Sequence, residues 1–194
     1  MENGLALLCG TDIPSELVFK PIARLAGLGS PLYVVDGDNS FRSYLISRYA
    51  RVMRLDPRLA LAHVQVSRAF TCYQLAAIVE CLSQRADTAD GVGTDSVGVD
   101  CAGIVCLGLL GTFYDEDVAW SEAERLLQEV IAHLKSLAKR RLVLVTVRPP
   151  SSKARNRQGL IQTLMQQADV VQVLPLDPPA RLPTQAPLRL RAGK

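Results

Sequence analysis

Two aspartates, Asp36 and Asp38, stand directly after a short apolar run, with one glycine between them. The run Leu32–Val35 is β-branched and aromatic and is bounded by turn-forming residues, which predicts a buried strand that ends at a loop. In an open parallel sheet, polar groups just beyond the carboxyl end of a strand lie where ligands bind, so both carboxylates are candidate catalytic residues. The alternative interpretation is an Asp-Gly-Asp turn that only caps the next helix.

The stretch that follows adds a second pattern. The chain reads D-G-D-N-S-F-R-S-Y at residues 36–44 and S-R-A-F-T-C-Y-Q-L at residues 67–75. This resembles the RecA-like strand-exchange ATPases, above all their RadA branch, which carry D-T-E-G-T-F-R-P-E, a helix, and then A-R-A-F-N-T with Q-L-L beyond. The resemblance implies a RecA-like α/β fold, a three-layer core with a mostly parallel sheet and late antiparallel edge strands. Alternating apolar strands and amphipathic helices predict the same fold class independently.

The first predicted strand, Leu5–Cys9, ends in a loop that resembles a degenerate phosphate-binding loop. In the family this loop reads G-x-x-x-x-G-K-[ST]: its amides hold phosphates, its lysine neutralises them and its hydroxyl holds Mg²⁺. Glu16 stands at the lysine position and would repel phosphate, whereas Lys20, one helical turn further on, can replace the lysine only in part. The residues of this degenerate nucleotide site are Gly10, Thr11, Ser15, Glu16 and Lys20.

Two further functional positions of the resembled family carry different residues here. The apolar run from Ala102 to Phe113 predicts a central strand, and the alignment puts Leu107 where the family has its magnesium-ordering Asp. The run Leu142–Val147 predicts another strand, after which Arg148 stands where the family has a Gln that senses the γ-phosphate. Asp36, Asp38 and Arg148 are therefore vestigial candidates, and the sequence predicts no bound cofactor and no metal. ATP with Mg²⁺ is an expected cofactor only under the alternative that the chain is an active enzyme.

The segment after that strand, Arg148–Arg157, is rich in cations and loop-forming residues and contains no acid. In the resembled family this position holds the second DNA-binding loop, and cations on an exposed loop suit contacts to phosphates. We therefore predict an exposed loop that contacts DNA; the alternative is an ordinary solvated loop. The predicted DNA-binding residues are Arg148, Lys153, Arg155 and Arg157.

The remaining chain predicts the elements around these positions. Helices are expected at Leu17–Leu25, Ser43–Leu55, Thr71–Leu82 and Trp120–Ala138, and strands at Val64–Thr71, Ala168–Leu174 and Leu188–Arg191. A flexible surface loop is expected at about residues 85–100, and residues 175–187 form a Pro-rich C-terminal segment.

Composition limits the class of protein. A chain of 194 residues suits a single domain, residues 1–194, and a net charge of +3 permits nucleic acid as a partner without requiring it. No apolar run approaches the roughly 18 to 20 residues of a membrane span. The five cysteines form no C-x-x-C pair and read as buried thiols, which makes a zinc site and a secreted protein poor interpretations. We expect an intracellular protein, cytoplasmic or nuclear, that acts on DNA.

The preferred interpretation is an ATPase-inactive RecA-like accessory protein of homologous recombination or DNA repair. Its expected partners are DNA, single-stranded or double-stranded, and a recombinase or recombinase paralogue, but no membrane. Two alternatives remain open. One is a nucleotide-binding ATPase with an atypical phosphate loop that uses Lys20 and the acids Asp36, Asp38 and Asp115. The other is a structural subunit that binds only protein.

Overall fold

Six parallel strands form one sheet in the computed structural model, which describes residues 3–88, 101–152 and 154–175. The strand order is β3-β2-β4-β5-β1-β6, and every pair in the sheet is parallel. The strands are β1 Gly4–Cys9, β2 Leu32–Asp36, β3 Val64–Arg68, β4 Gly103–Leu107, β5 Leu142–Val147 and β6 Val170–Val173. The predicted α/β three-layer fold is thus confirmed. The predicted late antiparallel strand at Leu188–Arg191 lies outside the described residues.

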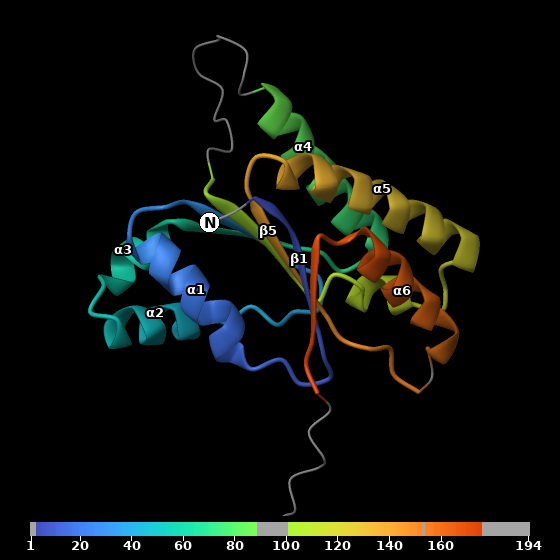
Figure 1. The fold of residues 1–194 in the computed structure, drawn as a ribbon, viewed down its shortest axis with the longest axis horizontal. Helices are drawn as coiled ribbons and strands as arrows, with labels where there is room; N and C mark the ends of the chain where they lie inside the picture. Colours follow the sequence, from blue (N-terminus) through green and yellow to red (C-terminus); the bar gives the residue numbers. More distant parts are fainter. Residues whose placement is uncertain (1–2, 89–100, 153, 176–194) are drawn as a thin grey trace, which may run out of the picture.

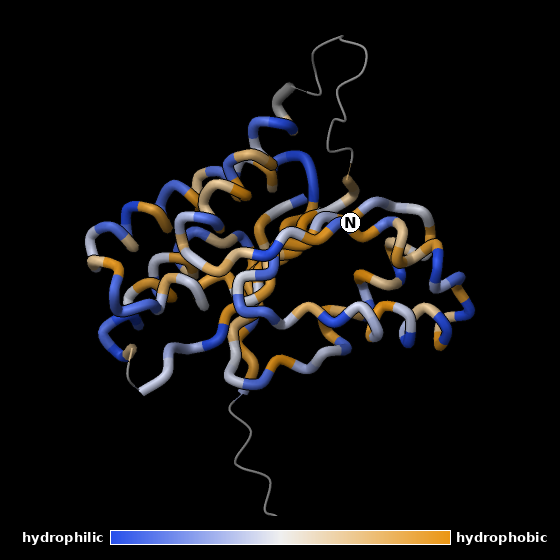
Figure 2. The backbone as a smooth tube through the Cα atoms, turned by 180° about the vertical axis from the view of Figure 1, so that it is seen from behind, coloured by the Kyte–Doolittle hydropathy of each residue, from blue (hydrophilic) through white to orange (hydrophobic). Residues whose placement is uncertain are grey.

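Helices cover both faces of this sheet (Figure 1). They are α1 Ser15–Gly27, α2 Ser43–Val52, α3 Pro57–Ala62, α4 Cys72–Thr88, α5 Trp120–Ala138 and α6 Gln158–Gln167. The first three pack together on one face, and the last three pack on the other. Because side chains alternate along a strand, β4 sends Val105 and Leu107 into the core under α1 and Ile104 and Cys106 into the core under α5. Figure 2 shows the result as a hydrophobic band along the strands between helices of mixed polarity.

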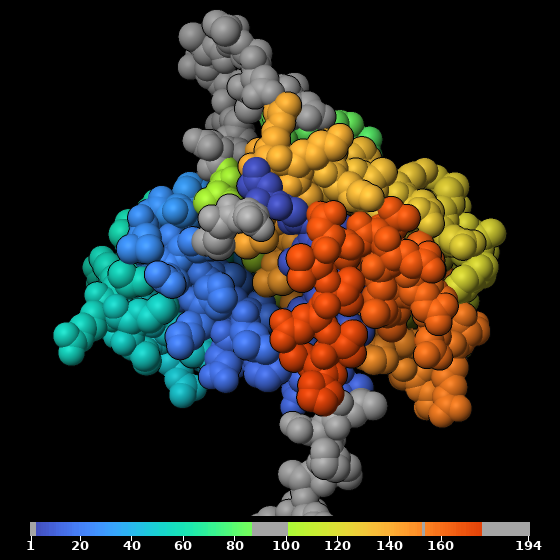
Figure 3. Space-filling model, viewed as in Figure 1, coloured from blue at the N-terminus to red at the C-terminus, as the bar shows by residue number. Residues whose placement is uncertain are grey.

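The strand order corrects one expectation about β1 and β2. The succession strand, loop, helix and strand over residues 5–35 predicts a βαβ unit whose two strands are neighbours or have one strand between them, but both β4 and β5 lie between β1 and β2. The two inserted strands are short apolar runs, and all five residues of β4 are buried, as the centre of a parallel sheet requires. At the other end of the order β1 pairs with β6, so the N-terminal and C-terminal parts of the described chain lie side by side (Figure 3).

Two boundaries differ clearly from the predicted ones, and two helices were not predicted. The run predicted as one strand to Phe113 stops at Leu107, because Gly108 adopts a left-handed conformation with φ of 58° and begins a turn. Helix α4 continues through Thr88, so residues 85–88 are helical rather than part of the predicted loop, whose remaining residues 89–100 lie outside the described chain. Helices α3 and α6 were not predicted. Helix α3 has only six residues, too few for a periodic pattern, whereas α6 buries Leu160, Ile161 and Leu164 at helical spacing, a signal that was overlooked.

The long helix α5 shows why the predicted amphipathic helices formed. Its apolar residues recur at helical spacing and are buried, whereas Arg125 on the outer face pairs with Glu122 and Glu129 at 2.8 and 2.5 Å.

In the described part of the chain, no helix combines the length and the apolar character needed to cross a membrane.

Candidate functional site

A cavity of about 450 Å³ opens at the carboxyl edge of the sheet. After β2 the chain continues on the face covered by α1, α2 and α3, whereas after the neighbouring strand β4 it continues on the face covered by α4, α5 and α6. The neighbouring strands β1 and β5 differ in the same way. Such a reversal opens a crevice in which open α/β sheets bind ligands. The lining residues come from the ends of four strands and from the helices α1 and α2. They are Ile13, Ser15, Val18, Phe19, Asp38, Asn39, Ser40, Arg42, Tyr44, Leu45, Arg48, Leu107, Thr146 and Arg148.

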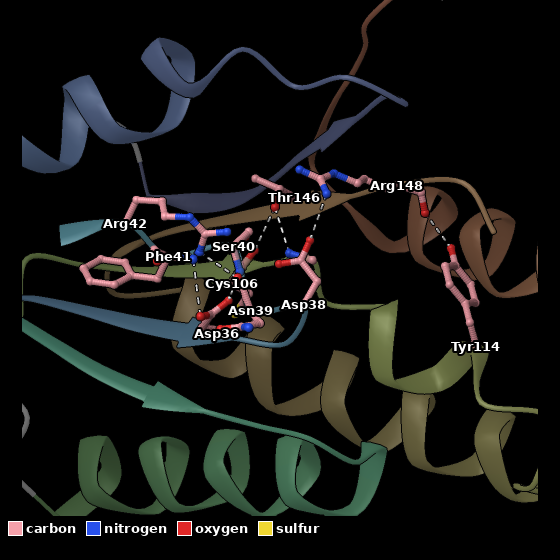
Figure 4. Close-up of polar contacts among 11 residues, drawn as sticks. Asp36, Asp38, Asn39, Ser40, Phe41, Arg42, Cys106, Tyr114, Thr146 and Arg148 are labelled. Atoms are coloured by element: carbon pink, nitrogen blue, oxygen red, sulfur yellow. Dashed lines mark hydrogen bonds and ion pairs between the residues drawn. The ribbon is translucent and has the colours of Figure 1, made fainter. Parts of the chain in front are cut away.

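Asp36 lies at the end of β2, as predicted, but it faces the protein rather than the cavity. Its carboxylate is fully buried and accepts hydrogen bonds from the backbone amides of Ser40 and Phe41, at 2.8 and 3.3 Å. It also accepts a hydrogen bond from Nε of Arg68 at 3.1 Å. Figure 4 shows how Asp36 holds Ser40 and Phe41 in the loop that leads into α2. The Asp-Gly-Asp turn interpretation therefore describes Asp36 better than a catalytic role does.

Asp38 does line the cavity. Its Oδ2 lies 3.7 Å from Nη1 of Arg148, and its Oδ1 is buried and has no hydrogen-bond partner among the described residues. The carboxylate packs directly over Gly108, where a Cβ atom would come within 2.0 Å of Asp38 Cγ. Gly108 thus supplies both the left-handed turn and the space that Asp38 occupies. Asp38, a predicted catalytic candidate, and Arg148, which stands where the resembled family has its sensor, point toward each other across the edge (Figure 4).

The ends of β4 and β5 complete the floor of the cavity. Thr146 accepts a hydrogen bond from the amide of Gly108 at 2.9 Å and fixes the turn after β4. Leu107, the last residue of β4, presents a buried apolar side chain where the resembled family has a metal-ordering carboxylate. Tyr114 donates a hydrogen bond of 2.8 Å to the carbonyl oxygen of Arg148. Burial raises the pKa of the Tyr114 phenol, and Cys9 adds a smaller contribution in the same direction. The phenol therefore stays a donor at neutral pH and holds the backbone of Arg148 at the rim.

The residues of the degenerate phosphate loop separate in space. Ser15 lines the cavity, and its Oγ lies 3.4 Å from the hydroxyl of Tyr49. Thr11, Glu16 and Lys20 are exposed and lie outside the lining, so Lys20 is not placed as a substitute for the missing lysine. Gly10 is buried against Leu174, where a Cβ atom would come within 3.0 Å of the leucine Cβ.

Two cations of the cavity were missed in the sequence. Arg42 and Arg48 were not among the predicted site residues, yet both line the cavity together with Arg148. Arg42 is exposed and is held by hydrogen bonds of 2.8 and 3.0 Å from its Nη1 to the carbonyl oxygens of Asn39 and Phe41. The position of Arg42 just after the strand of Asp36 was a signal that could have found it, whereas Arg48 lies inside α2 and had no such signal. Among the lining residues, these three arginines face one acid, Asp38.

The basic segment does not act as one exposed unit. Arg155 is exposed, and Lys153 lies outside the described residues. The expectation that Arg157 is exposed is wrong, because only 3% of this residue is accessible. Its guanidinium donates hydrogen bonds to the carbonyl oxygens of Asp115 and Val118 and lies 5.7 Å from the centre of the Trp120 ring. Arg157 therefore anchors the loop that precedes α5.

Replacing Arg157 with Ala is expected to lower the free energy of unfolding by about 2 kcal/mol, because two carbonyl groups lose a charged donor and Trp120 loses a packing partner. Arg155→Ala removes an exposed cation from the same short turn and is expected to change stability by less than about 0.5 kcal/mol. Urea denaturation monitored by circular dichroism measures both. Equal stability of the two variants would contradict the anchoring role of Arg157.

No three His, Cys, Asp or Glu side chains gather as a metal-binding group within the part of the chain that the structure describes. The carboxyl edge of the sheet instead offers a cationic cavity with a fixed floor, one acid and three arginines.

A scan against protein-family models found none that matches the chain, and a search of curated proteins found no match either.

Proposed function

We propose that this chain is a RecA-like accessory protein of homologous recombination or DNA repair that binds the phosphate groups of DNA at the carboxyl edge of its sheet and does not hydrolyse ATP. The observation that carries the proposal is the cavity in which Arg42, Arg48 and Arg148 outnumber the single acid. Arginine suits phosphate because its planar fork of donors matches the phosphate oxygens.

The same cavity argues against phosphoryl transfer. That reaction depends on a lysine at the phosphates and on carboxylates or hydroxyls that order Mg²⁺. Here Glu16 and Lys20 lie outside the cavity, and the strand end that faces it carries Leu107. The resemblance to the recombinases supports a recombinase or recombinase paralogue as the protein partner.

One observation favours a nucleotide-binding ATPase as a second candidate. Ser15 and Asp38, from the two segments that resemble nucleotide-site elements, line one cavity of about 450 Å³. In that case Asp38 is the catalytic carboxylate, and its loss abolishes turnover. The DNA-binding proposal assigns Asp38 the opposite effect, since it is the one acid that faces incoming phosphates.

Asp38→Asn is therefore the discriminating variant. We expect it to bind a labelled single-stranded oligonucleotide about fivefold more tightly at low salt, which corresponds to about 1 kcal/mol for removing a like charge near 4 Å in water. Asp56→Asn makes the same change in net charge at an exposed helix cap outside the cavity and should leave the affinity nearly unchanged. Fluorescence anisotropy measures both, with ATP turnover measured on the same samples.

The outcomes separate the three functions. Tighter DNA binding by Asp38→Asn, with no turnover in either protein, supports the proposal. ATP turnover in the wild type that Asp38→Asn abolishes supports the ATPase. If the wild type binds neither single-stranded nor double-stranded DNA at low salt, a subunit that binds only protein is the better account.

A further inference from the structure

The cationic cavity holds more hydrogen-bond donors than the protein itself uses. Arg42 donates to two carbonyl oxygens from Nη1 alone, so its Nε and Nη2 have no acceptor among the described contacts. Arg48 has neither a hydrogen-bond partner nor an ion-pair partner among the described residues. Nη1 of Arg148 lies 3.7 Å from Oδ2 of Asp38, which is longer than a hydrogen bond. All three arginines are exposed, so a ligand in the cavity can reach them.

The amino end of helix α2 adds to the positive potential of this cavity. Arg42 is the N-cap residue of α2, its side chain makes no capping hydrogen bond, and the first turn of the helix contains no acid. The amino end of a helix carries about half a positive charge, and its first amides have no acceptor within the helix. Because Tyr44 of this first turn also lines the cavity, the helix favours an anion where the arginines do.

The charge of the lining fits a dianion better than a monoanion. Three arginines against the one acid, Asp38, leave an excess of two positive charges among the lining residues. A phosphate inside a DNA strand is a diester with one negative charge. A phosphate at the end of a strand is a monoester, which carries about −1.5 to −2 at pH 7 and offers three terminal oxygens to donors.

The shape of the cavity agrees with the end of a strand. Its volume of about 450 Å³ lies within the range of roughly 300 to 1,000 Å³ that is usual for small-ligand sites. Leu107 and Thr146, at the ends of β4 and β5, close its floor. A terminal phosphate can point at this floor, whereas a diester phosphate has a sugar on each side and must leave room for both.

We propose that the cationic cavity binds the phosphomonoester at the end of a DNA strand in preference to the diester phosphates within the strand. Arg42, Arg48 and Arg148 donate to its three terminal oxygens, and the strand continues outward over the rim. This inference rests on the proposed function and names the part of the DNA that the cavity prefers. A free nucleotide carries the same monoester, so the experiment includes one.

The test compares three single strands of one sequence that differ only at the 5′ end, which carries a hydroxyl, a phosphate, or a phosphate methyl ester. The methyl ester keeps the bulk of the phosphate but has only one negative charge. Fluorescence anisotropy, with the label at the 3′ end, measures the three affinities. We expect the wild type to bind the phosphorylated strand about fivefold more tightly than the methyl ester, the factor for one further charge near 4 Å in water, and more tightly still than the hydroxyl strand. A second set, modified at the 3′ end and labelled at the 5′ end, tests the other terminus.

Arg48→Gln is the informative variant. It removes a cation that no described protein group pairs with, so the melting temperature should stay unchanged while most of the fivefold preference is lost. Arg51→Gln makes the same change in charge on the same helix, outside the cavity lining, and should keep the preference. A ³¹P NMR titration of the phosphorylated strand with the wild type needs no variant. Its monoester resonance should shift before those of the diesters.

The outcomes separate the end site from the proposed function. If the wild type binds all strands of both sets equally, the end site is overturned and DNA binding through diester phosphates stands. If no strand binds, the proposed function fails and the end site fails with it. Equal loss of the preference in Arg48→Gln and Arg51→Gln would overturn the cavity as its source. Full competition by deoxycytidine monophosphate at the concentration of the strand would overturn the strand end in favour of a free nucleotide.

Discussion

Replacing Asp36 with Ala is expected to lower the free energy of unfolding by about 3 to 4 kcal/mol, because it removes a buried carboxylate that accepts hydrogen bonds from two backbone amides and pairs with the partly exposed Arg68. The carboxylate is fully buried, and it holds the amides of Ser40 and Phe41 together with the guanidinium of Arg68. No other acceptor among the described contacts of these two amides replaces it. The loss should also weaken DNA binding, since this loop positions Arg42.

Asp56→Ala is the matched control for this variant. Asp56 also accepts a backbone hydrogen bond, from the amide of Arg58 at 2.8 Å, but it is an exposed cap of a short helix. Its loss is expected to cost only about 1 kcal/mol. Urea denaturation of the two variants and the wild type gives the comparison. A cost for Asp36→Ala no larger than that for Asp56→Ala would show that the loop does not depend on the buried carboxylate.

Removing the three arginines of the cavity is expected to produce the largest change in binding. Each phosphate contact on a single strand contributes about 0.7 to the slope of log affinity against log salt, so Arg42, Arg48 and Arg148 together contribute about 2. At 0.1 M salt this corresponds to a loss of about a hundredfold in affinity when all three become Ala. The loss should be similar for all sequences, because phosphate contacts carry no base information.

The control is a triple variant with the same change in net charge. Arg24, Arg51 and Arg58 are exposed and lie outside the cavity lining, so their replacement with Ala should leave the salt slope nearly unchanged. The melting temperature of each variant shows whether the fold is retained. Equal losses in the two triple variants would mean that the protein attracts DNA by its net charge rather than by the cavity.

The sequence predicted the fold class and the position of Asp36 and Asp38, because both depend on local apolar runs that end at turn-forming residues. It did not predict that β4 and β5 separate β1 from β2, since strand order depends on contacts between segments far apart in the chain. It also did not predict that β4 ends at Leu107. This end depends on the left-handed turn at Gly108, which composition alone does not reveal.

Charge was the least predictable feature of the site. Arg157 belongs to a basic segment, yet it is buried beside Trp120, a residue far earlier in the chain. Arg42 lies just before α2 and Arg48 lies within it, and both line the cavity because α2 starts at the carboxyl edge of the sheet. Composition identifies cations, but only the packing of distant elements decides which of them a ligand can reach.

The central claim is that DNA phosphates bind at the carboxyl edge of the sheet, and the most direct test is to map the bound strand by amide chemical shifts. A ¹⁵N-labelled protein titrated with a single-stranded oligonucleotide should show its largest shifts at the loop after β2, from Asn39 to Arg42, and at Thr146 and Arg148. The amino edge, represented by Ser30, Ala102 and Leu142, should remain unchanged. Shifts concentrated at the amino edge, with none in the loop after β2, would contradict the account.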